Sequence, residues 1–159
     1  LEDAGAQLAE IDLTEIATLW LTSNVILAVE AATFHTPYLI KHFSDYGEFC
    51  KDRLLSAFAF SGGDFVKAQK IRQTIRSKWN HLLKNFDLLV THSQPEKTHL
   101  LDEPSSTRFM NSFNILGWPA MSVPVGRDSD GLPLGIQLVA KPWQEELLLR
   151  AAQTIESSQ

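Results

Sequence analysis

Apolar residues recur along much of the chain at the three- and four-residue steps of a helix, interrupted by short strand-like runs. The clearest helix begins at Asp64, which we expect to act as its N-cap. Its apolar stripe consists of Phe65, Ala68, Ile71, Ile75, Trp79, Leu82 and Phe86. The opposite face carries Lys67, Lys70, Arg72, Arg76, Lys78 and Lys84. We interpret this charged face as solvated, with a phosphate-binding patch as the alternative.

Weaker patterns predict four more helices. Residues 14–34 follow a helical stripe with Thr14 as a plausible N-cap, and Pro37 should end it. Short helices are expected over residues 53–59 and 107–116, the second leading to Gly117. A final helix buries Leu147, Leu148, Ala151, Ala152 and Ile155, and Pro142 suits its start.

Three short apolar segments are predicted to be strands. Residues 87–92 form a short buried strand, and residues 120–125 and 133–140 form a hairpin around an Asp-Ser-Asp-Gly turn. Residues 1–13 read as a helix end, a stop at Gly5 and an edge strand. Because helices and short strands are interleaved, we predict an α/β fold in which part of a mixed β-sheet is flanked by helices.

The composition limits the classes of function that the chain can have. The chain has 159 residues, of which 44% are hydrophobic and 21% charged, and this is typical of a globular domain. Its net charge of −5, without a cluster of Lys and Arg, disfavours nucleic acid and anionic membranes as partners. The single Cys50 forbids an internal disulfide and a Cys-based zinc site. We find no signal peptide and no run of eighteen apolar residues, so we expect no membrane span and a cytoplasmic location.

Residues 113–140 carry the most specific pattern. They read Phe-Asn-Ile-Leu-Gly-Trp-Pro-Ala, then a strand, a turn and Gly-Leu-Pro-Leu-Gly-Ile-Gln-Leu-Val-Ala, before a helix opened by acidic residues. This order and spacing resemble the C-terminal signature of amidase-signature hydrolases, which cleave amide bonds. The resemblance implies that residues 1–159 are the C-terminal part of a single amidase-signature domain, incomplete at its N-terminal side.

The resemblance also implies a mechanism. The family uses a serine nucleophile, a second serine in a cis peptide and a lysine base, all within an earlier Gly/Ser-rich region. We find no such region here, because Ser61-Gly62-Gly63 reads as the start of a helix. We therefore expect no catalytic residue in this chain, which alone should be inactive. Its partners would be a small-molecule amide substrate and the N-terminal catalytic part of the same protein, with no cofactor.

Three residues are candidates for substrate binding. His92 lies just past a strand end, where α/β sheets place ligands, although a surface-loop histidine is the plainer interpretation. Asn111 and Asn114 flank the signature, and the resemblance implies that this segment lines the acyl side of the pocket. Their alternative role is to hold the turn at Gly117 through hydrogen bonds. Glu30, within an apolar run, is either a functional carboxylate or a structural hydrogen-bond acceptor.

Other assignments are weaker. His92 and His99 lack carboxylate or thiol ligands at a recognisable spacing, so we expect no metal site. The segment beginning at Asp128 is a turn rather than a calcium loop, because the last ligand position would be Val139 instead of Glu.

Two other functions stay open. An amidotransferase A-type subunit would carry a Tyr-Asp-Gly-x-Arg type motif where this chain has Thr-Phe-His-Thr-Pro-Tyr, at residues 33–38. A stand-alone binding or regulatory module derived from an amidase is the second alternative. We also expect the chain by itself to expose apolar surface and to self-associate as a homo-oligomer.

Overall fold

The computed structural model describes residues 2–94 and 106–158, which form five α-helices, four short 3-10 helices and three strands. The 3-10 helices are η1 (Glu2–Ala4), η2 (Phe43–Asp45), η3 (Ala57–Ala59) and η4 (Leu83–Asn85). The α-helices are α1 (Ile16–His42), α2 (Glu48–Ser56), α3 (Gly62–Leu82), α4 (Arg108–Leu116) and α5 (Glu145–Ser157). The strands are β1 (Leu88–His92), β2 (Ala120–Arg127) and β3 (Pro133–Ala140).

The three strands form one sheet in the order β1-β3-β2, and both pairings are antiparallel. The predicted β2–β3 hairpin is confirmed, with a register shift between Pro124 and Gly126. At its turn, the Asp128 carboxylate accepts hydrogen bonds from the backbone N–H groups of Asp130 and Leu132, both at 2.9 Å. Asp128 therefore closes a turn, as its sequence indicated.

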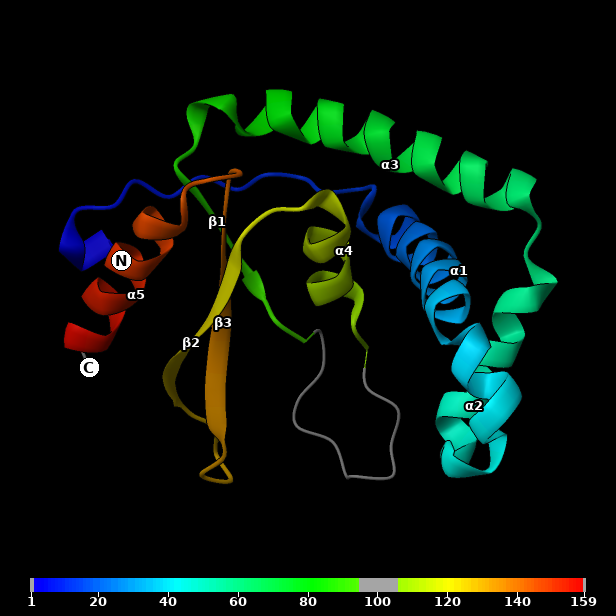
Figure 1. Ribbon diagram of the computed structural model, residues 1–159. Helices are drawn as coiled ribbons and strands as arrows, with labels where there is room; N and C mark the ends of the chain where they lie inside the picture. Colours follow the sequence, from blue (N-terminus) through cyan, green and yellow to red (C-terminus); the bar gives the residue numbers. More distant parts are fainter. Residues whose placement is uncertain (1, 95–105, 159) are drawn as a thin grey trace.

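Helices cover both faces of this sheet (Figure 1). Leu138 and Ala140 of β3 pack with Leu148, Ala152 and Ile155 of α5 in one hydrophobic cluster. The intervening Val139 turns to the other face and joins a larger cluster built from α1, α3, α4 and β1. Because successive strand residues point to opposite faces, β3 contributes to both cores. The predicted α/β arrangement with flanking helices is confirmed.

Three aromatic side chains fill the centre of the larger core. The rings of Trp79, Phe113 and Trp118 lie with centroids 6.1 to 6.5 Å apart, and each is almost completely buried. Trp79 Nε1 donates to Glu15 Oε2 at 3.2 Å, whereas Trp118 Nε1 has no acceptor among the described residues. Trp79 and Trp118 therefore lie in the same core, but only the indole N–H of Trp79 donates a hydrogen bond to a described residue.

Glu15 joins the start of α1 to α3. Its carboxylate accepts hydrogen bonds from the Lys78 ammonium group and from the Trp79 indole. These bonds lower the pKa of Glu15 from 4.5 to about 2, the Lys78 bond having the largest effect. Because the ionised carboxylate is the form that accepts both bonds, this contact holds the two helices together only while Glu15 is charged.

The first helix is longer than the sequence suggested. The prediction that Pro37 ends it was wrong, since α1 continues to His42 with Pro37 inside. Proline removes one backbone hydrogen bond, but Leu39 in the following turn is buried in the fold. The burial of Leu39 therefore offsets the free energy that is lost with the backbone hydrogen bond at Pro37.

Several element boundaries also differ from those predicted. Ser61, rather than Asp64, is the N-cap of α3; its hydroxyl accepts from Asp64 N at 3.1 Å, while the Asp64 carboxylate accepts from Ser61 N at 2.9 Å. This capping box confirms that the Ser-Gly-Gly segment starts the helix. Helix α1 begins after Glu15, and α5 begins at Glu145 rather than at Pro142. Residues 6–13 form no strand, although Gly5 does end a helical turn with φ of 86°.

Residues 21–60 expose many large apolar side chains. These are Leu21, Leu27, Phe34, Tyr38, Ile40, Phe43, Phe49, Leu55, Phe58 and Phe60. The stretch Ile16–Asp45 is also long and apolar enough to cross a membrane by length and composition, a test that core helices of soluble proteins also pass. A single helix of this kind is weak support for a span, and α1 packs against α3 and α4 in the larger core.

The two core tryptophans provide a matched test of the Glu15 contact. Trp79→Phe and Trp118→Phe remove similar volume from one core, but only Trp79→Phe breaks an indole hydrogen bond. We expect Trp79→Phe to lower the free energy of unfolding by about 1 to 2 kcal/mol more than Trp118→Phe. Equilibrium denaturation of both variants measures the difference, and an equal or larger loss in Trp118→Phe contradicts it.

The lowered pKa of Glu15 predicts a specific pH dependence. A carboxyl whose pKa falls on folding contributes stability above its unfolded pKa of 4.5, and this stability disappears as pH drops towards 2. Lys78 is largely exposed, so we expect Glu15→Gln to cost only about 1 to 2 kcal/mol at neutral pH. The difference from wild type should vanish between pH 4.5 and 2. Glu156→Gln, on exposed α5 surface, should show no such trend.

Candidate functional site

A row of polar side chains crosses the sheet near the end of β1. Thr91 of β1 is in register with Gln137 of β3, which is in register with Ser122 of β2. Gln137 is only 5% exposed, and its side-chain amide donates to Thr91 Oγ1 at 3.1 Å. Beyond it, the hydroxyls of Ser93 and Ser122 lie 3.2 Å apart. These residues form a hydrogen-bonded polar surface on the face of the sheet that α4 covers.

His92 lies beside this row but on the opposite face. It pairs in register with Ile136, which belongs to the cluster around α5, and it is exposed. It lines a cavity of about 720 Å³ along the outer edge of β1. The other lining residues include Leu8 and Leu13 near the start of the chain, and Phe86 just before β1. His92 is thus the last residue of β1, rather than the first residue past the strand, and a cavity adjoins it.

Asn111 and Asn114 lie on α4 and face α1. Both line a pocket of about 210 Å³, which Glu30 and Ser23 of α1 also line. The structure thus brings together three residues that the sequence singled out separately: the two asparagines and Glu30. The apolar side chains that line this pocket are Ile26, Leu27 and Ile115. Such a pocket can hold an apolar group while carboxamide and carboxylate groups at its rim bind a polar end.

The sequence also suggested that Asn111 and Asn114 hold the turn after α4 through hydrogen bonds. Gly117 takes the left-handed conformation with φ of 69°, and its N–H donates to the carbonyl oxygen of Asn114 at 3.0 Å. The helix therefore ends through backbone bonds and a glycine. No side-chain bond from either asparagine to this turn occurs among the described residues.

Two serine hydroxyls of the polar row lie next to each other. The Ser93 and Ser122 hydroxyls are bonded to each other, and neither has a histidine or lysine partner in residues 2–94 and 106–158. The same described ranges hold no group of three metal-ligating side chains. His99 lies outside the described residues.

The described residues form an α/β fold in which helices flank a small antiparallel sheet. The chain belongs to the amidase family, whose family model, described as Amidase, matches residues 1–149. It is 31% identical to a fatty acid amide hydrolase of Oryza sativa subsp. indica over 96% of the chain and 27% of that protein. It is 32% identical to the A-type subunit of the glutamyl-tRNA(Gln) amidotransferase of Rhodospirillum rubrum, over 98% of the chain and 37% of that protein.

Solved structures share this fold. A crystal structure of an amidase superposes with a TM-score of 0.88 at 20% identity, covering 99% of the chain and 39% of the other. Kluyveromyces lactis allophanate hydrolase superposes with a TM-score of 0.87 at 26% identity, covering 98% and 27%. The chain therefore spans roughly a quarter to two fifths of the length of the relatives it matches.

Gln137 is the buried member of the polar row, and sequence reasoning singled out neither it nor Thr91, Ser93 and Ser122. It lies within the quoted signature, in Gly135-Ile-Gln, so a polar residue inside an otherwise apolar strand was the available signal. A buried side-chain amide normally requires a hydrogen-bond partner, and Thr91 supplies it from 46 residues away in the chain. At Gly135, an added Cβ would approach Ser122 Oγ to 3.2 Å, so the backbone also packs closely at this row.

The Thr91–Gln137 bond can be measured by a double-mutant cycle. We expect Thr91→Val and Gln137→Leu to show a coupling of about 0.5 to 1.5 kcal/mol in the free energy of unfolding. The more exposed pair Ser93→Ala and Ser122→Ala, whose hydroxyls also bond, serves as the control and should couple less. Additive effects of Thr91→Val and Gln137→Leu would mean that the bond contributes nothing.

Proposed function

We propose that this chain is the C-terminal portion of an amidase that hydrolyses carbon–nitrogen amide bonds. The serine, cis-serine and lysine mechanism is supplied by another part of the same polypeptide. This portion completes the sheet and forms one wall of the substrate pocket through Asn111 and Asn114 of α4, whereas His92, on the opposite face of the sheet, lines a different cavity. The relatives, which are named for amide hydrolysis and amidotransfer, support the reaction class.

The outer edge of β1 is the observation that carries this proposal. Leu88–His92 pair with β3 on one side and with no described strand on the other. A free edge leaves backbone N–H and C=O groups available to a further strand. The cavity of about 720 Å³ along this edge is lined mainly by apolar side chains, among them Leu88, Val90 and Phe109. The free edge suits pairing with a further strand of the same domain, and the apolar cavity beside it suits packing by the side chains of that part.

Activity-based labelling tests where the nucleophile lies. We expect the complete reading frame to hydrolyse an acyl amide, such as a long-chain fatty acid amide, and the isolated 159-residue chain to show no turnover. A fluorophosphonate should label one serine of the complete protein and abolish turnover. Peptide mapping should place that serine outside these 159 residues, and a labelled serine within them would overturn the proposal.

The pocket wall is tested by kinetics of the complete enzyme. A side chain that contacts substrate in both ground and transition states affects KM more than kcat. We expect Asn111→Ala and Asn114→Ala each to raise KM by about threefold to tenfold with little change in kcat. Asn80→Ala, on the exposed surface of α3, is the matched control and should leave both constants unchanged.

An amidotransferase A-type subunit is the second candidate, favoured by the Rhodospirillum rubrum relative, which aligns with 98% of the chain. Glutamine-dependent ammonia transfer in the presence of a partner protein would favour it over a general amidase. Hydrolysis of a fatty acid amide without any partner would favour the general amidase. For either candidate we propose a cytoplasmic location, in keeping with a single cysteine and no disulfide.

A further inference from the structure

A cavity of about 550 Å³ lies between α1, α2 and η3, and neither the signature residues nor the proposed pocket wall accounts for it. Its α1 side is formed by Asn24, Leu27, Ala28, Ala31 and His35. Because these positions are spaced by three and four residues, they form one continuous stripe on the helix. The volume falls within the range of roughly 300 to 1,000 Å³ that small-molecule sites occupy.

The walls of this cavity are apolar and partly exposed. Leu27, Phe49 and Phe60 line it, and Phe49 is 75% exposed. Leu54 also lines the cavity and is buried. Exposed aromatic and aliphatic side chains around a cavity gain free energy when an apolar group covers them. An occupant with an aliphatic or aromatic body would therefore be stabilised here.

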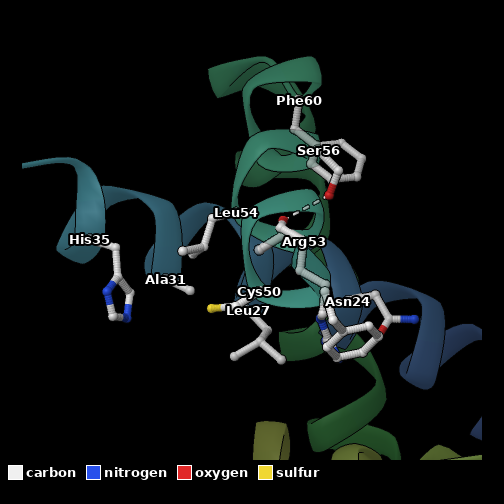
Figure 2. Close-up of a pocket in the computed structure, with 11 residues that line it drawn as sticks. Asn24, Leu27, Ala31, His35, Cys50, Arg53, Leu54, Ser56 and Phe60 are labelled. Carbon is white, nitrogen blue, oxygen red and sulfur yellow. Dashed lines mark hydrogen bonds between the residues drawn. The ribbon is translucent and has the colours of Figure 1, made fainter. Parts of the chain in front are cut away.

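Arg53 gives the cavity a positive end. Its guanidinium group lies over the Phe49 ring, 5.7 Å from the centroid, and makes no ion pair with a carboxylate among the described residues. The neighbouring Lys51, by contrast, pairs with Glu48 at 2.8 Å. Figure 2 shows Arg53 and Asn24 towards one end of the cavity and His35 towards the other. The cation and the side-chain amide can together bind a carboxylate.

His35 closes the opposite end. Its Nδ1 is hydrogen-bonded to the Tyr46 hydroxyl at 2.9 Å, and its ring meets the Tyr46 ring edge-on. The imidazole is thereby fixed in place as part of the wall. A ligand bound at Arg53 would extend past Leu27 and Leu54 towards this aromatic end.

We propose that this cavity binds an aliphatic carboxylate of medium chain length, with its carboxylate on Arg53 and Asn24 and its chain running along Leu27 and Leu54 towards His35. A neutral amphiphile would leave the guanidinium without an anionic partner, and a cationic one would be repelled. The inference does not require amide hydrolysis, so it can fail while the proposed function stands, and the reverse holds as well.

Cys50 provides a direct readout. It lines the cavity, it is exposed, and it is the only cysteine in the sequence. We would measure the alkylation rate of Cys50 by iodoacetamide in the complete protein, at the level of the Cys50 peptide by mass spectrometry. Decanoate, kept below its micellar concentration, should slow alkylation in a saturable manner, by about fivefold when it is present at four times its Kd. Decyltrimethylammonium and propionate, which lack the charge or the chain, should give less than about twofold protection.

Variants of Arg53 test the anionic end. Arg53→Gln should abolish protection by decanoate while leaving the ligand-free alkylation rate and the Tm unchanged, since Arg53 is exposed. Arg53→Lys, which keeps the charge, should retain part of the protection. Arg150→Gln, on the exposed surface of α5, is the matched control and should behave as wild type.

Four results would overturn the inference. They are no protection by decanoate, equal protection by the cationic amphiphile, full protection in Arg53→Gln, and an unreactive Cys50 in the ligand-free complete protein. The last result would mean that another part of the polypeptide already fills the cavity.

Discussion

Strand β3 is paired on both sides and buried on both faces along its second half, and the packing of the described chain depends on this position. Leu138 and Val139 are both almost completely buried, yet they point into different cores. A shift of one residue in the register of β3 would exchange these two side chains between the α5 face and the α4 face. The two pairings of β3 and the turn at Asp128 fix that register, and so they fix where α4 and α5 can pack.

The larger core connects this sheet to the helical end of the molecule. Trp79, Phe113 and Trp118 come from α3, α4 and the segment before β2, and Glu15 ties the start of α1 to the same cluster. Helix α1 then runs from this core to the cavity beside α2, so one helix contributes to the pocket at Asn111 and to the cavity at Arg53. Leu27 lines both of them. A change in how α1 packs would therefore alter the two binding surfaces together.

The free edge of β1 and the exposed apolar surface of residues 21–60 have different consequences. The edge offers backbone hydrogen bonds and an apolar cavity, which suits a further layer of the same domain. The surface around α1 and α2 offers aromatic side chains and a cation that has no ion-pair partner in the described chain, which suits a small amphipathic ligand. Membership of the amidase family is established, whereas the parts played by these two surfaces are our proposals.

The sequence by itself determined the features that local chemistry controls. The Ser-Gly-Gly start of α3, the left-handed Gly117 after α4 and the β2–β3 hairpin all follow from residues that lie within a few positions of one another, and the signature around them indicated the family. Only the tertiary structure decided that α1 continues through Pro37, that Gln137 bonds to Thr91, and that His92 faces away from Asn111 and Asn114. These outcomes depend on which elements meet across long stretches of sequence. A spacing pattern shows which residues share a face of their own element, but the packing partner of that face is set by the free energy of the assembled core.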